Sequence, residues 1–215
     1  MNRRQFSMFA LGGLGLAAMP RSLASATVSN FGPLPPLPAQ PLRPMTSTDL
    51  LIERAKNALD EHQSQFALRD RIAVADFSVA SRELRFHLVD LISGQRNSYL
   101  VAHGKGSDPE HSGWLHRFSN VPDSEASSEG AYRTGQMYVG QHGQSMRLVG
   151  LDPTNNMAED RAIVVHAAPY VSEDHIAQWG KVGRSQGCFA VAPHMLSQVL
   201  GMLGQGRMLY AGRAA

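Results

Sequence analysis

From residue 72 onward, apolar residues recur at every second position, and this period constrains the fold more than any other feature of the chain. The segments "IAVADFSVA" and "RELRFHLVDL" both show it; in the second, Leu84, Phe86 and Leu88 alternate with polar residues. A period of two places side chains on opposite faces of a strand, whereas a helix requires a period of 3.6. We therefore predict a mainly β domain with a few helices, with strands over residues 72–80 and 82–91.

Further strands and two helices complete the expected architecture. The strands are expected over residues 97–103, 136–140, 145–151, 161–166 and 207–212, with a hairpin turn at residues 141–144 and a central position for 161–166. The helices are expected over about residues 49–64, with Leu51, Ala55, Ala58 and Leu59 on one face, and over residues 193–203, with Pro193 in the first turn. Residues 103–135 show little periodicity, and a loop of this length is usually functional or disordered.

The first 26 residues have the three parts of a secretory signal. Arg3 and Arg4 provide a positive start, an apolar, glycine-rich run follows, and the small residues of 24–26 suit a signal peptidase. The apolar run is too short for a membrane span. Because Arg3-Arg4-Gln5-Phe6 fits the twin-arginine pattern, we expect export to the periplasm or cell envelope by that route; an ordinary secretory signal is the alternative.

Residues 27–48 are predicted to form a proline-rich linker before a single domain at residues 49–215. Six of the twelve prolines lie within residues 31–44, and such a run forms neither a sheet ladder nor a helix. Cleavage after Ala26 would remove three arginines and no acidic residue, which changes the formal net charge from +2 to −1. The chain therefore does not indicate nucleic-acid binding, and after cleavage no apolar segment is long enough for an integral membrane span.

The chain contains one cysteine, Cys188, in the polar stretch "GRSQGC". A single cysteine forms no internal disulfide, and export exposes a free thiol to oxidation. A buried, inert cysteine is the common alternative. Because the flanking residues are small and polar, unlike those of a core strand, Cys188 is a candidate nucleophile.

A cysteine nucleophile needs a base for its proton and hydrogen-bond donors for the oxyanion. His166, at the end of "RAIVVH", is the candidate base, because a strand end holds a side chain rigidly; a histidine that merely caps the strand is the alternative. Gly187 would let the backbone turn tightly before the thiol. Ser185 would fix that turn through its hydroxyl, or would be an ordinary turn serine.

The stretches "VAHGKGS", "YVGQHGQSMRLVGLD" and "RAIVVHAAPYVSEDHIAQWGKVGRSQGCFAVAP" together resemble the YkuD-type L,D-transpeptidases, in particular the murein L,D-transpeptidase catalytic-domain branch. The similarity extends over about residues 71–193. It implies a β-sandwich or barrel with the thiol in a cleft under a mobile flap, which part of residues 103–145 would supply. Gln186 and Ala190 depart from the family pattern, since many members carry histidine at the first position and arginine or asparagine at the second.

The resemblance implies a peptidoglycan L,D-transpeptidase that crosslinks stem peptides through a cysteine thioester and uses no cofactor. Cys188 would be the nucleophile, His166 the base and Ser185 a supporting residue, with the N–H groups of Gly187 and Cys188 in the oxyanion hole. Pairing with His166 would lower the pKa of the thiol. The resemblance also implies a covalent carbapenem adduct at Cys188. The alternatives are an L,D-carboxypeptidase or endopeptidase that hydrolyses stem peptides at the same site, and a non-catalytic wall-binding protein.

The residues that would hold the stem peptide carry a weaker signal. Tyr138, His142 and Arg161 are the candidates; an arginine on a strand face can clamp a carboxylate through two hydrogen bonds. A zinc site among the histidines of residues 103–116 is not indicated, because none of them shows the spacing His-Glu-x-x-His. We therefore expect no metal.

Overall fold

The computed structural model describes residues 44–214. The predicted signal at residues 1–26 lies outside the described residues, as does the predicted linker up to residue 43. None of the described helices combines the length and the apolar character that a membrane crossing requires.

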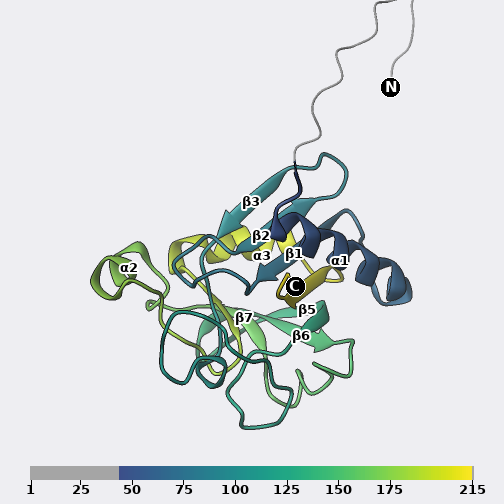
Figure 1. The fold of residues 1–215 in the computed structure, drawn as a ribbon. Coiled ribbons are helices and arrows are strands. Elements are labelled where there is room, and N and C mark those ends of the chain that lie inside the picture. Colours follow the sequence, from purple (N-terminus) through teal and green to yellow (C-terminus); the bar gives the residue numbers. More distant parts are fainter. Residues whose placement is uncertain (1–43, 215) are drawn as a thin grey trace, which may run out of the picture. The chain divides into compact units, whose positions relative to one another are not determined.

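Within residues 44–214, nine strands form one mixed sheet (Figure 1). Their order across the sheet is β3-β2-β1-β9-β5-β6-β7-β8-β4. Neighbours are antiparallel except for the parallel pairs β1 with β9 and β7 with β8. The strands are β1 Arg71–Asp76, β2 Phe86–Asp90, β3 Arg96–Tyr99, β4 Val101–Ala102, β5 Gly130–Gly140, β6 Gly143–Gly150, β7 Val164–Ala167, β8 Phe189–Val191 and β9 Met208–Gly212.

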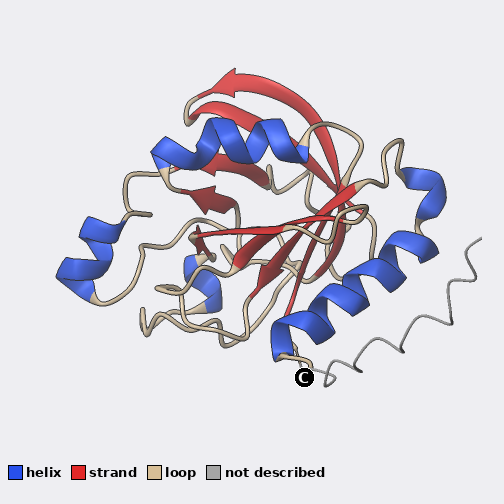
Figure 2. Cartoon of the chain, turned by 90° about the horizontal axis from the view of Figure 1, so that it is seen from above, coloured by secondary structure: helices blue, strands red, loops and turns tan. Residues whose placement is uncertain are grey.

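The two edges of this sheet come from consecutive parts of the chain. Only Leu100 separates β3, at one edge, from β4, at the other. Consecutive Cα atoms lie about 3.8 Å apart, so the sheet must curl until its edges come close together. The view from above in Figure 2 shows the curvature of the strands. The expected β-rich, barrel-like fold is confirmed.

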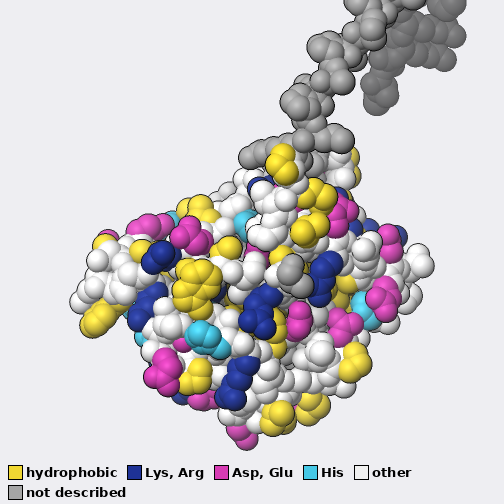
Figure 3. All heavy atoms as spheres, in the orientation of Figure 1, with side chains coloured by type: hydrophobic (Ala, Val, Ile, Leu, Met, Phe, Trp, Pro, Cys, Tyr) yellow, Lys and Arg dark blue, Asp and Glu magenta, His cyan; other side chains and the backbone are white. Residues whose placement is uncertain are grey.

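Basic and acidic side chains are interspersed on the face of the molecule drawn in Figure 3. Neither sign forms a broad separate region on that face. This distribution agrees with the small net charge of the sequence.

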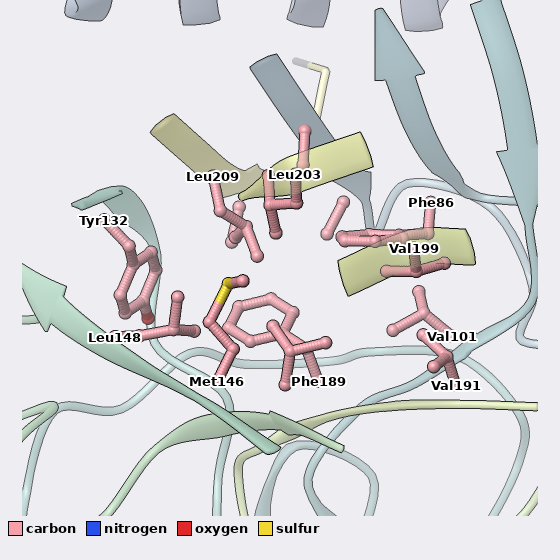
Figure 4. Close-up of a cluster of buried hydrophobic side chains, with 14 of the residues drawn as sticks. Phe86, Val101, Tyr132, Met146, Leu148, Phe189, Val191, Val199, Leu203 and Leu209 are labelled. Carbon is pink, nitrogen blue, oxygen red and sulfur yellow. The ribbon is translucent and has the colours of Figure 1, made fainter. Parts of the chain in front are cut away.

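The main hydrophobic core fills the inside of the curled sheet (Figure 4). Phe86, Tyr132, Met146 and Phe189 meet there from four different strands, and each is almost fully buried. Helix α3, Leu196–Leu203, packs its apolar face against the same cluster. The hydrophobic effect thus joins strands that are far apart in the sequence, including the one that follows the cysteine.

Helix α1, Ser47–Glu61, packs against β1 and β9 and forms a second core with them. Thr46 and Asp49 form a capping box: the Thr46 hydroxyl accepts from the Asp49 N–H at 3.1 Å, and the Asp49 carboxylate accepts from the Thr46 N–H at 3.0 Å. Leu51 and Ala55 are fully buried. The predicted helix is therefore confirmed, although the capping box starts it two residues earlier than expected and it ends at Glu61.

The predicted hairpin is confirmed, and the predicted strand at residues 161–166 is confirmed in part, because β7 begins only at Val164 and ends at Ala167. β5 and β6 pair up to Gly140 and Gly143, which leaves Gln141 and His142 as the turn. The long loop is shorter than predicted, because β5 begins at Gly130. The described residues also contain the short 3₁₀ helices Gln63–Gln65, Lys105–Ser107 and Pro193–Met195.

Three details of the predicted architecture are wrong. Residues 97–103 form two strands instead of one, because the chain changes sheet edge at Leu100. The second strand begins only at Phe86, so Leu84 is 56% exposed and lies outside the sheet. A third α-helix, α2 Glu173–Trp179, was not predicted; Ser172 caps its start and Gly180, with φ 70°, ends it.

Candidate active site

The parallel strands β7 and β8 bring His166 and Cys188 together. Val165 lies in register with Phe189, and His166 with Ala190. Val165 and Phe189 are fully buried in the main core, so alternate residues face the other side of the sheet. His166 belongs to that alternate set, whereas Cys188 directly precedes β8 and packs in part against the main core; both residues line one pocket. The predicted base and nucleophile therefore share one site.

The turn before the thiol is held by Ser185. Its hydroxyl donates to the carbonyl oxygen of Cys188 at 2.7 Å and accepts from the N–H of Gly187 at 3.1 Å. Gly187 has φ 109°, and a Cβ atom there would lie 2.7 Å from the carbonyl oxygen of Ala126. Only glycine suits this position, because L side chains rarely adopt such a φ and the space is already filled.

The same hydrogen bonds change the expected oxyanion site. Because the Gly187 N–H already donates to Ser185, it does not point freely at a substrate in this geometry. The expectation that Gly187 and Cys188 both supply N–H donors is therefore wrong for this geometry, and only the Cys188 N–H remains as a candidate.

The Cys188 thiol is half-buried, and its Sγ donates to the carbonyl oxygen of Ala162 at 3.6 Å. Burial raises the pKa of the thiol above its ordinary value of 9.0, while the Val164 N–H and the Arg161 guanidinium offset part of this rise. The expectation that His166 depresses the pKa of the thiol is therefore wrong for this geometry. At neutral pH the thiol is protonated.

His166 is oriented by its own strand. Its Nδ1 lies 2.8 Å from the carbonyl oxygen of Ala167, which only accepts, so Nδ1 carries the proton and Nε2 is the free acceptor of the neutral ring. Burial lowers the pKa of His166 below its ordinary value of 6.5; repulsion from His142 adds to this, and the hydrogen bond to Ala167 opposes it. The imidazole is therefore neutral at pH 7 and able to take a proton.

His142 reaches the site from the turn between β5 and β6. Its ring stacks on the ring of His166, with centroids 4.4 Å apart and planes at 27°. The Gln141 side chain lies 3.2 Å from Nε2 of His142. The tip of this hairpin therefore lies against the base, within the segment from which a flap was expected.

A pocket of about 340 Å³ opens at the thiol. It is lined by Gln141, His142, His166, Tyr170, Arg184, Ser185, Gln186 and Cys188. The sequence did not single out Tyr170 or Arg184. Arg184 lies in the same short stretch as Cys188, so the sequence could have indicated that it lies near the thiol. No sequence pattern marks Tyr170. Burial raises the pKa of Tyr170 to about 12, so its hydroxyl stays protonated.

Arg161 does not lie on a strand as expected, because β7 begins only at Val164. Its guanidinium donates to the carbonyl oxygens of Ser119, at 2.9 Å, and Ala126, and to the Ser128 hydroxyl at 3.4 Å. These bonds tie Arg161 to the long loop. It lines a neighbouring hollow of about 380 Å³ and not the pocket of the thiol.

Tyr138 also lies outside the pocket lining. Its ring packs under the guanidinium of Arg147, 4.6 Å from the ring centroid, on the same hairpin. Of the three candidate substrate-binding residues, only His142 reaches the pocket.

A buried polar cluster supports the loop behind the turn. The fully buried Arg85 donates to the carbonyl oxygens of Val101 and Val79 and to Nδ1 of His103 at 2.7 Å. Nε2 of His103 then donates to the Asp108 carboxylate at 3.3 Å. Burial is the main cause that lowers the pKa of Arg85 to about 9 and that of His103 to about 3, so His103 is neutral.

The backbone beside this cluster pairs directly with the turn before Cys188. The Ser185 N–H donates to the carbonyl oxygen of His103 at 2.9 Å, and the Lys105 N–H donates to that of Ser185 at 2.8 Å. The buried cluster therefore positions the start of the cysteine turn. The loop histidines have structural partners: His111, for example, donates to the carbonyl oxygen of Val182 at 3.1 Å. Within residues 44–214, no three His, Cys, Asp or Glu side chains are grouped to hold a metal ion.

Comparison with known proteins gives one strong match. A family model described as the L,D-transpeptidase catalytic domain matches residues 45–211. No curated protein matches the chain.

Comparison with solved structures finds similarity at low identity. An L,D-transpeptidase from Mycobacterium tuberculosis is 13% identical, with a TM-score of 0.44 over 67% of this chain and 58% of that chain. An L,D-transpeptidase from Stackebrandtia nassauensis is 14% identical, with a TM-score of 0.40 over 74% of this chain and 64% of that chain. L,D-transpeptidase 3 from Mycobacterium tuberculosis, solved with a faropenem-derived adduct, is 12% identical, with a TM-score of 0.42 over 67% and 60%. This chain thus spans less than two thirds of each of these three chains.

Proposed function

Because the chain belongs to the L,D-transpeptidase catalytic domain family, we propose that it crosslinks peptidoglycan stem peptides through a thioester on Cys188. One observation carries this proposal: His166, on β7, and Cys188, directly before β8, line a single pocket. An inert structural cysteine needs neither an adjacent base nor an open cavity.

In the first step, the Cys188 sulfur attacks the carbonyl carbon of the diamino-acid residue in the donor stem. Because burial favours the neutral thiol and the neutral imidazole, the proton moves to Nε2 of His166 as the C–S bond forms. The Cys188 N–H donates to the carbonyl oxygen and stabilises the negative charge that develops there.

In the second step, the peptide C–N bond breaks. The leaving amine takes the proton from His166, and the terminal D-residue departs, which leaves a thioester. An amine of a neighbouring stem then attacks this thioester and gives its proton to His166, which returns it to the sulfur as the C–S bond breaks. Water in place of the amine would give hydrolysis; the amine is the better nucleophile in a half-buried site.

The test is incubation of the purified protein with disaccharide-tetrapeptides, followed by mass spectrometry. We expect crosslinked dimers from the wild type and none from Cys188→Ala or Cys188→Ser, because a hydroxyl is much harder to ionise than a thiol. Both variants should keep the wild-type unfolding midpoint. Tripeptides without dimers would show an L,D-carboxypeptidase, and equal product from the wild type and Cys188→Ala would contradict a cysteine mechanism.

A carbapenem should acylate the same sulfur if it is an accessible nucleophile. We expect the intact mass to rise by one carbapenem in the wild type and to stay unchanged in Cys188→Ala. An unmodified wild type would count against an acyl-enzyme at this site.

The proposed substrate places the protein in the cell envelope. We propose export by the twin-arginine route, on the pattern of Arg3 and Arg4. Replacing both by lysine should leave the precursor in the cytoplasm, as shown by fractionation. Undiminished export of that variant would favour an ordinary secretory signal.

A further inference from the structure

Arg184 lines the pocket of the thiol and is held from one side. Its Nη1 donates to the carbonyl oxygens of Asp108 and Pro109, the latter at 3.0 Å. Its Nε and Nη2 form no hydrogen bond with residues 44–214, and the guanidinium has no carboxylate partner among them. Nε and Nη2 make up an edge that can bind a carboxylate through two parallel hydrogen bonds. The side chain is therefore fixed while this edge stays open.

The charges around the pocket favour an anion on this side. Among the described residues that line the pocket none is acidic, and Arg184 carries its one permanent charge. The neighbouring hollow shares Gln186 with the pocket but carries three acidic residues, Asp123, Glu125 and Asp160, against the single cation Arg161, whose guanidinium is already bound to backbone carbonyl oxygens. A carboxylate would be repelled from that hollow and attracted to Arg184.

We infer that Arg184 binds the C-terminal carboxylate of the donor stem peptide, and so selects donors that end one residue after the attacked carbonyl. This inference rests on the proposed function. The departing D-residue carries that carboxylate, and its Cα lies about 3.8 Å from the Cα of the residue that is acylated. Arg184 and Cys188 line the same pocket, on either side of the turn that Ser185 holds, so the attacked carbonyl and the carboxylate of this short unit would both lie in that pocket.

Calorimetric binding tests the inference without turnover. The protein carries Cys188→Ala, and the ligands are a disaccharide-tetrapeptide acid and the same molecule with a C-terminal amide. We expect the acid to bind about ten- to a hundredfold more tightly, as befits a charge-assisted bidentate contact. The protein that also carries Arg184→Gln should lose this preference, because only its binding of the acid becomes weaker. The protein that carries Arg184→Lys instead should keep part of the preference.

A matched control removes a guanidinium from the long loop between β4 and β5, to whose carbonyl oxygens Arg184 also donates. Arg117 is exposed, and its Nε donates to the carbonyl oxygen of Gly106 at 2.9 Å outside the pocket. Arg117→Gln should keep the full preference for the acid. Equal binding of acid and amide, an unchanged preference in Arg184→Gln, or equal losses for both ligands would each overturn the inference. Because binding is measured without the thiol, a failure to detect crosslinking in the wild type would count only against the proposed function.

Discussion

The protonation of Cys188 and His166 is set mainly by burial, which favours the neutral form of each. Burial raises the pKa of the thiol and lowers the pKa of the imidazole. Since the thiolate is the reactive form, a neutral thiol also reacts slowly with oxidants. Burial therefore protects a cysteine that has no disulfide partner within the chain.

His142 should shift the pH dependence of catalysis through His166. His142→Phe keeps the ring stack and removes the charge. Because repulsion from His142 lowers the pKa of His166, and catalysis needs neutral His166, we expect the acid limb of kcat/KM, which lies below pH 6.5 in the wild type, to move to higher pH. The plateau value of kcat/KM should be unchanged in His142→Phe. It should fall about two- to tenfold in His142→Ala, which also loses the ring stack.

The measurement is kcat/KM for crosslinking across the acid range. Tyr138→Phe is the matched control, because it lies on the same hairpin but outside the pocket lining. It should leave both the plateau and the midpoint unchanged. An acid limb that stays in place in His142→Phe would show that the two imidazoles are not coupled.

At the scale of the elements, the long loop depends on a charge buried beneath it. Arg85 satisfies two backbone carbonyls and one ring nitrogen, and through His103 it reaches Asp108. Asp108 in turn accepts from the N–H groups of Ser112 and Gly113 and so fixes the next part of the loop. A buried ion is costly to leave unpaired, so this cluster acts as one unit.

Replacing Arg85 by alanine should therefore destabilise the whole domain. It leaves buried acceptors without donors, and we expect the free energy of unfolding to fall by about 3–5 kcal/mol. Urea unfolding followed by circular dichroism gives this value. Arg82→Ala is the control: Arg82 is exposed and pairs only with Glu83, so its loss should change stability by less than about 0.5 kcal/mol. A change below about 1 kcal/mol for Arg85→Ala would contradict the role given to this cluster.

At the scale of the whole molecule, separate hydrophobic clusters on the two faces of the sheet support one site. The main core lies inside the curl and includes Phe189, the residue after Cys188. The second core lies outside, between α1 and the strands β1 and β9. Since β9 also pairs with β5, helix α1 braces the strand that leads into the hairpin of His142.

Substitutions of two neighbouring leucines of α1 test how far the packing of this helix stabilises the domain. Leu51 is 0% exposed and Leu50 is 47% exposed, so both substitutions by alanine alter helix propensity equally but differ in burial. Leu51→Ala should lower the free energy of unfolding by about 2–5 kcal/mol, and Leu50→Ala by less than about 0.5 kcal/mol. Urea unfolding distinguishes them. Equal losses would mean that α1 is not packed on the sheet as described.

Patterns contained within one segment were readable from the sequence. The apolar run of β1, the hairpin of β5 and β6 and the polar turn at Cys188 each depend on a few adjacent residues; β1 is buried on both faces and does not show the expected period of two. The presence of His166 and Cys188 at one pocket could also be anticipated, because a strand end and a lone thiol in a polar turn are local features. Arg184 stands in the same stretch as Cys188, so its place near the site could also have been predicted.

Features that depend on closure of the sheet were not readable. Leu100 lies within an uninterrupted apolar pattern, yet the chain passes there from one edge of the sheet to the other. The reason is that β4 pairs with β8, which is distant in the sequence. The burial of Arg85 has no signal in the sequence, because Arg85 alternates with apolar residues and its partners come from residues 79, 101 and 103. Helix α2 is short and mostly polar, so tertiary contacts and caps define it more than periodicity does.

The short strands at the two ends of the sheet also bear on solubility. An exposed edge offers unpaired backbone groups to other chains and can template aggregation. Here the terminal strands contain four and two residues, and a single residue joins them, so little backbone is presented in register. A protein whose sheet ends in this way is poorly suited to growing by intermolecular strand addition.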